Sequence, residues 1–62
     1  MIAHYNPDTR EVTILDRNLN AIGHCRETKP GAWDFVRDPW HSGELSTEQV
    51  HFIEGELATL NR

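Results

Sequence analysis

At 62 residues, with ten acidic against six basic side chains, the chain has room for one small domain and carries a formal net charge of −4. That charge, without a basic stripe, argues against direct binding to nucleic acid, and no apolar run approaches the ~20 residues that span a membrane. The only cysteine, Cys25, excludes an internal disulfide, and with no leader-like pattern at Met1–Tyr5 we expect a cytoplasmic protein.

Residues 1–37 are predicted to form an antiparallel β-meander of three or four strands. We expect strands at residues 1–5, 11–16, 21–27 and 32–37, where β-branched and aromatic side chains are frequent. Turn-forming residues separate these segments: Asn6-Pro7-Asp8-Thr9, Arg17-Asn18-Leu19-Asn20 and Lys29-Pro30-Gly31. In the second turn, the two asparagines are able to take a left-handed backbone. Short connections of this kind make consecutive strands antiparallel neighbours.

The alternation of side chains along these strands predicts which face is buried. Core candidates are Val12 and Ile14 on the second strand and Trp33 and Phe35 on the fourth. The opposite face then receives Leu15, Ile22 and Val36, so it is not fully polar. Either a partner covers part of that face, or the true register differs.

The third strand places small residues on one of its faces: Ala21, Gly23 and Cys25. A helix can approach such a face closely, because little side-chain bulk stands between the two backbones. We therefore expect Cys25 to be a small buried apolar residue.

After a loop at residues 38–46, residues 47–61 are predicted to form an amphipathic helix. Ser46 and Gln49 have the spacing of an N-terminal capping box, and Leu45 and Val50 that of a hydrophobic staple. A 3-4-3 spacing predicts one buried stripe: Val50, Ile53, Leu57 and Leu60. The fold class is thus α+β, a small antiparallel β-meander packed by one C-terminal α-helix, in a single domain of residues 1–62.

A second strip of the helix lies outside this stripe and is formed by Phe52, Gly55 and Thr59, flanked by Glu48 and Glu56. On one interpretation Phe52 folds over the edge of the sheet or covers Trp40, and Gly55 has no particular role. On the other, the strip is a docking face on which Phe52 is an anchor and Gly55 permits close backbone approach.

The loop contains a tryptophan, Trp40, between Pro39 and His41. A domain this small cannot easily bury a loop tryptophan, and exposed tryptophans are frequent binding anchors. The alternative is that Trp40 packs back over the sheet and caps the core. The candidate partner-binding residues are Trp40, His41, Glu48, Phe52, Gly55, Glu56 and Thr59.

No spacing in the chain is typical of a catalytic or metal site. Paired zinc ligands such as Cys-x₂-Cys or His-x₃-His do not occur, and His24 and Cys25 point to opposite faces of one strand. Ser42 follows His41 directly, and sequence neighbours seldom reach the geometry for nucleophilic attack. We therefore expect neither an enzyme nor a bound metal or cofactor.

These observations favour a protein–protein interaction module, an inhibitor or adaptor of the compact kind that phages and mobile elements encode. One alternative is an acidic mimic of nucleic acid that blocks a DNA-acting enzyme. It is suggested by residues 43–62, in which four glutamates against Arg62 alone give a net charge of −3. Another is a homodimer, formed through the Phe52 strip or through an open sheet edge.

Overall fold

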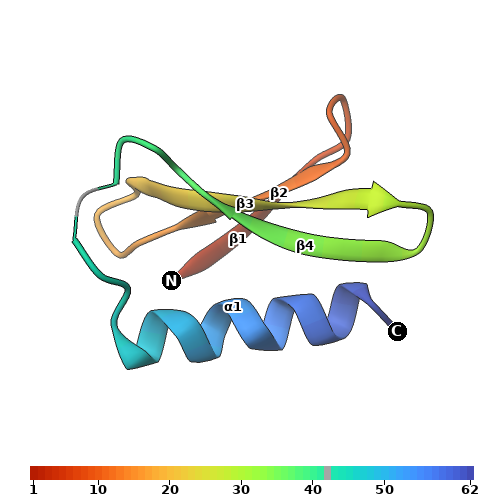
Figure 1. The fold of residues 1–62 in the computed structure, drawn as a ribbon. Coiled ribbons are helices and arrows are strands. Elements are labelled where there is room, and N and C mark those ends of the chain that lie inside the picture. Colours follow the sequence, from red (N-terminus) through yellow and green to blue (C-terminus); the bar gives the residue numbers. More distant parts are fainter. Residues whose placement is uncertain (42) are drawn as a thin grey trace.

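The computed structural model describes residues 1–41 and 43–62 and shows a four-stranded antiparallel sheet with one helix along one face (Figure 1). The elements are β1 (Ile2–Asn6), β2 (Glu11–Leu15), β3 (Ala21–Lys29), β4 (Ala32–Arg37) and α1 (Thr47–Leu60), and the strand order is β1-β2-β3-β4. The predicted α+β meander with a C-terminal helix is therefore confirmed. Ser42, which the sequence raised as a nucleophile, lies outside the described residues.

The core lies between the sheet and α1 and is formed by Val12, Ile14, Ile22, Cys25 and Ile53. Trp33 and Phe35 are half-buried and pack against it, as the alternation of β4 predicted. Gly23 is also buried, and a Cβ at this position would collide with the ring of Phe35. The small face of β3 thus accommodates an aromatic ring as well as the helix.

The alternation predicted Ile22 on the open face of the sheet. In the structure it is fully buried in the core. Ile14 pairs with Gly23 whereas Leu15 pairs with Ala21, so Ile22 is the extra residue of a β-bulge. A bulge interrupts the two-residue period, which is why strict alternation assigned Ile22 to the wrong face.

The helix begins as predicted but is rotated about its axis relative to the predicted stripe. Both capping-box hydrogen bonds between Ser46 and Gln49 are present. Ile53 is buried, yet Val50 is 38% exposed, so its assignment to the buried stripe was wrong. Phe52 turns instead toward the sheet and packs against the core. A ring there buries more apolar surface than the smaller Val50 would.

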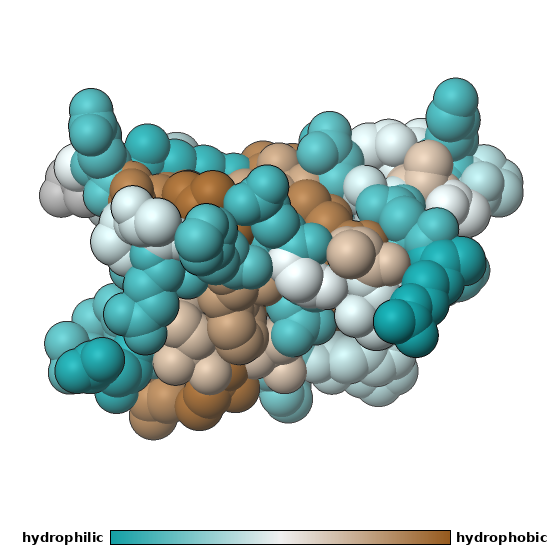
Figure 2. Space-filling view, turned by 90° about the horizontal axis from the view of Figure 1, so that it is seen from below, coloured by the Kyte–Doolittle hydropathy of each residue, from teal (hydrophilic) through white to brown (hydrophobic). Residues whose placement is uncertain are grey.

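One short helix does not cover the whole sheet. It packs chiefly against β4, and apolar surface remains uncovered in patches among polar surface on the helix side (Figure 2). The large exposed apolar residues are Ile2, Tyr5, Leu19, Trp40 and Val50. The described helix is not long and apolar enough to cross a membrane.

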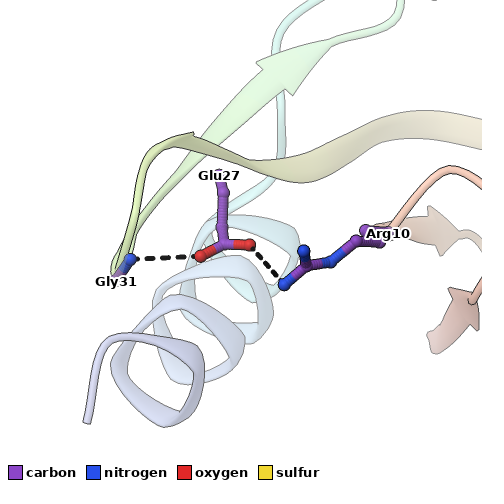
Figure 3. A network of polar contacts seen from close by, with 3 residues as sticks. All are labelled: Arg10, Glu27 and Gly31. Carbon is purple, nitrogen blue, oxygen red and sulfur yellow. Dashed lines mark hydrogen bonds and ion pairs between the residues drawn. The ribbon is translucent and has the colours of Figure 1, made fainter.

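A polar network ties the β1–β2 turn to the β3–β4 turn (Figure 3). Glu27 accepts hydrogen bonds from the Arg10 guanidinium at 3.1 Å and from the Gly31 N–H at 3.1 Å. Gly31 has a φ of 79°, in the left-handed region that glycine adopts without strain. This network fixes the end of the sheet opposite the loop that carries Trp40 (Figure 1).

Candidate interaction site

The side chain of Trp40 is 90% exposed, the highest value among the large apolar residues that the structure describes. The alternative in which Trp40 packs back over the sheet and caps the core is therefore not what the structure shows. An indole in water exposes a large apolar area that binding would remove.

The loop that carries Trp40 is held by hydrogen bonds on both sides of the residue. The Asp38 N–H donates to the Ile22 carbonyl at 3.0 Å, which anchors the loop to the bulge of β3. The Asp38 carboxylate accepts from the Trp40 N–H at 2.8 Å, and its carbonyl accepts from the His41 N–H at 3.0 Å. The Arg37 guanidinium donates to the His41 carbonyl at 3.4 Å. Trp40 is thus exposed on a hydrogen-bonded part of the loop.

An open hollow of about 450 Å³ lies beside Trp40, between this loop and the β2–β3 turn, and is lined by Asp16, Asn20, Ala21, Asp38, Trp40 and His41. The Asp16 carboxylate accepts from the N–H groups of Asn18 and Asn20, both at 2.9 Å, so the second wall is also held in place. The predicted candidates Trp40 and His41 meet here, together with two carboxylates that sequence reasoning had not assigned to a site.

Leu19, at the tip of the β2–β3 turn, is a further exposed residue that the sequence analysis missed. It is 64% exposed and has a φ of 64°, whereas the neighbouring asparagines, which could take this conformation, do not. A left-handed backbone is strained for a branched residue such as leucine. The sequence signal that could have identified Leu19 is that it is an apolar residue within an asparagine-rich turn. The "Trp40 surface" hereafter means the six residues that line the hollow together with Leu19.

The helical candidates do not form one face. Glu48, Gly55 and Thr59 are exposed, whereas Phe52 and Glu56 are half-buried on the side that faces the sheet. The Thr59 hydroxyl donates to the Gly55 carbonyl at 3.1 Å within the helix. The interpretation of Phe52 as an outward-facing anchor is therefore wrong, because its ring is used by the core. None of these residues lines the hollow beside Trp40.

Cys25 is the one nucleophilic side chain in the core. Burial raises the pKa of its thiol, and the negative charges of Glu56 and Asp34 raise it further. A protonated, buried thiol is a poor nucleophile. In the part of the chain that the structure describes, no three potential metal ligands lie together.

Two smaller hollows, of about 280 and 310 Å³, lie beside the Arg10–Glu27 pair. Their charged walls include Glu11, Arg26 and Lys29. Two of the lining residues, Arg10 and Glu27, belong to the polar network described above, in which the guanidinium and the carboxylate lie 3.1 Å apart.

Comparison of the chain with protein-family models, with curated proteins and with solved structures gave no significant match.

Proposed function

We propose that this protein is a non-enzymatic interaction module that binds another protein through the Trp40 surface, as a compact inhibitor or adaptor. The observation that carries the proposal is that Trp40 is almost fully exposed on a hydrogen-bonded loop. Tryptophan is among the residues most enriched at the energetic centre of protein interfaces.

The hydrogen bonds on both sides of Trp40 support this role, because a loop that is ordered before binding loses less conformational entropy on binding. The β2–β3 turn adds Leu19, which is exposed in a strained conformation, at the same end of the sheet (Figure 1). Strain kept in an exposed turn costs stability, and such costs are concentrated at functional surfaces. The partner would receive the indole and the Leu19 side chain in an apolar recess of its own surface.

The polar residues of the hollow indicate the charge of the partner. Asp16 and Asp38 are half-buried beside Trp40, and His41 stands next to them. A basic partner rim would complement these carboxylates and favour one orientation of docking. The free thiol of Cys25 suits a reducing compartment, so we place this interaction in the cytoplasm.

The acidic-mimic alternative has less support from the geometry. Glu48 and Glu54 are exposed on α1, but Glu56 is half-buried and close enough to Cys25 to influence its thiol. A mimic needs a continuous exposed row of charge to occupy a phosphate channel. The paired reversal Glu48→Lys/Glu54→Lys provides the comparison in the experiment below.

The proposal is tested by introducing a photoreactive benzoylphenylalanine at position 20, which is exposed, lines the hollow and leaves Trp40 in place, and, in a control protein, at the exposed position 54. Irradiation in the native host followed by mass spectrometry identifies any crosslinked protein. We expect a discrete crosslinked partner from position 20 and none from position 54. Binding of the purified partner is then measured for wild type, Trp40→Ala and Glu48→Lys/Glu54→Lys.

Loss of binding in Trp40→Ala, with the glutamate reversal close to wild type, is the expected pattern. The converse pattern, in which Trp40→Ala binds normally and the glutamate reversal does not, would reject the Trp40 surface in favour of the acidic helix. Crosslinking from position 54 alone would have the same meaning.

A further inference from the structure

The two edge strands of the sheet, β1 and β4, differ in how their outward main-chain groups are paired. At the β4 edge, the Asn61 side chain bonds both the N–H and the carbonyl of Trp33, at 2.7 and 3.2 Å. The next outward N–H, that of Phe35, donates to the Asp34 carboxylate at 2.9 Å. Three outward main-chain groups of this edge, those of Trp33 and the N–H of Phe35, are therefore already paired within the chain.

The β1 edge can be read from the same alternation, because main-chain groups point alternately to the two sides of a strand. The Trp33 main chain points away from β3, so that of Asp34 points toward β3. Asp34 opposes Arg26, whose main chain therefore points toward β4, so that of the next residue, Cys25, points toward β2. Cys25 opposes Val12, so the main chain of the next residue of β2, Thr13, points toward β1. Thr13 opposes His4.

His4 therefore directs its main-chain groups toward β2, and its neighbours Ala3 and Tyr5 direct theirs outward. Within the described residues, no hydrogen bond from another segment reaches the N–H or carbonyl of Ala3 or Tyr5. The sequence Ile2-Ala3-His4-Tyr5-Asn6 contains no Lys, Arg, Asp, Glu or Pro. These are the residues that natural proteins use to protect an exposed edge.

Exposed side chains make this edge apolar as well as open. Ile2 is 47% exposed and Tyr5 is 52% exposed, and they project from opposite faces of β1. The helix packs chiefly against β4, at the opposite edge of the sheet from β1.

We propose that β1 pairs antiparallel with β1 of a second copy of this chain, about a two-fold axis at His4, to form one continuous sheet. With this register Ala3 lies opposite Tyr5 of the second copy, so the outward N–H and carbonyl of both residues are all paired. A register centred on Tyr5 would place Ala3 opposite Pro7 of the second copy, which has no N–H to donate, and one centred on Ala3 would place Tyr5 opposite Met1, outside the strand.

The side chains fit the same register. The large Tyr5 ring lies across from the small Ala3 on the helix face, and Ile2 lies across from Asn6 on the open face. The two His4 side chains meet at the axis, where closely spaced Cα atoms are about 4.5 Å apart. No like formal charges oppose each other along the strand.

The proposal is tested first by sedimentation velocity over a wide range of protein concentration. The mass should rise from the monomer value of 7.2 kDa toward twice that value. Ala3→Pro removes an outward N–H without removing a bond to β2, so it should weaken the dimer about tenfold or more. Unfolding of this variant at the lowest concentration checks that its monomer remains folded.

A cysteine at the axis gives a second, independent measurement. His4→Cys should form a disulfide-linked dimer under mild oxidation, because the facing Cβ atoms are within disulfide reach. The matched control Ile2→Cys, on the same strand and face, should not link to itself, because position 2 lies opposite Asn6 of the second copy and away from the second position 2. The native Cys25 is buried and should not contribute.

Specific linkage at position 4, lost in the double variant Ala3→Pro/His4→Cys, is the expected outcome. A mass of 7.2 kDa at every concentration would overturn the proposal. So would a dimer that is unaffected by Ala3→Pro, or one that links equally well at positions 2 and 4.

Discussion

The side-chain amide of Asn61 forms two hydrogen bonds with the main chain of Trp33. The Trp33 N–H donates to Asn61 Oδ1 at 2.7 Å, and Asn61 Nδ2 donates to the Trp33 carbonyl at 3.2 Å. Asn61 is also the C-cap of α1, where its own N–H donates to the Leu57 carbonyl. One residue thus ends the helix, joins it to the sheet and occupies the place of a fifth strand.

Replacing Asn61 by alanine should therefore lower the free energy of unfolding by about 1–3 kcal/mol, since each of the two bonds contributes about 0.5–1.5 kcal/mol. Urea unfolding followed by circular dichroism measures this loss. Arg62→Ala, at the next position, is the control and should stay within about 0.5 kcal/mol of wild type. Equal effects at the two positions would show that the amide does not join helix and sheet.

Two glycines should respond to alanine in opposite directions. At Gly23 a Cβ would collide with the Phe35 ring and the Val36 carbonyl, so Gly23→Ala should destabilise by about 1–3 kcal/mol. At Gly55 a Cβ meets open space in the middle of α1, so Gly55→Ala should stabilise by about 0.5–1 kcal/mol. Thermal unfolding of both variants measures the difference, and destabilisation by Gly55→Ala would contradict this packing.

The Cys25 thiol should resist alkylation in the native protein and react readily in urea, because the folded state buries it and raises its pKa. The same shift makes stability depend on pH. The unfolded thiol ionises near its ordinary value of 9.0, while the folded thiol keeps its proton to higher pH. Above that value the unfolded state binds fewer protons, so stability falls as the pH rises and is fully retained below it.

This pH dependence is measured by urea unfolding of wild type and Cys25→Ala at about pH 8 and about pH 10. Wild type should lose more stability than the variant between the two conditions. Rapid iodoacetamide labelling of the native protein would contradict the burial of this thiol.

Leu19→Gly should stabilise the monomer by about 1 kcal/mol, because glycine adopts the left-handed conformation at this position without steric cost. If Leu19 belongs to the binding surface, the same variant should bind the partner more weakly. Stability and affinity would then change in opposite directions. A variant that is both more stable and equally tight would remove Leu19 from the Trp40 surface.

The elements of this fold could be predicted from local chemistry. Turn residues, the capping box of Ser46 and the β-branched run of β2 each act over a few neighbouring residues. The face of the sheet on which Ile22 lies could not be predicted, because the bulge that buries it is a property of two paired strands. The rotation of α1 has a similar origin, since the sheet accepts the Phe52 ring rather than the side chain of Val50.

The candidate site was predicted only in part. Trp40 and His41 were found because a tryptophan in a short loop is conspicuous in a small domain. Asp16, Asn20 and Leu19 could not be joined to them, because the β2–β3 turn meets the loop only after the sheet has formed. The helical strip was predicted as one face because the centre of the buried stripe was placed too far toward Val50. With the stripe as the structure has it, Phe52 and Glu56 are half-buried, whereas Glu48, Gly55 and Thr59 are exposed.

The most direct test of the Trp40 surface is an equilibrium binding titration of the crosslinked partner, once purified, with wild type, Trp40→Ala and Val50→Ala. Val50 is an exposed apolar residue on another element, so it controls for general loss of apolar surface. Trp40→Ala should lose at least about 2 kcal/mol of binding free energy and keep its unfolding free energy within about 0.5 kcal/mol. Val50→Ala should bind like wild type. Equal affinities of wild type and Trp40→Ala would contradict the account.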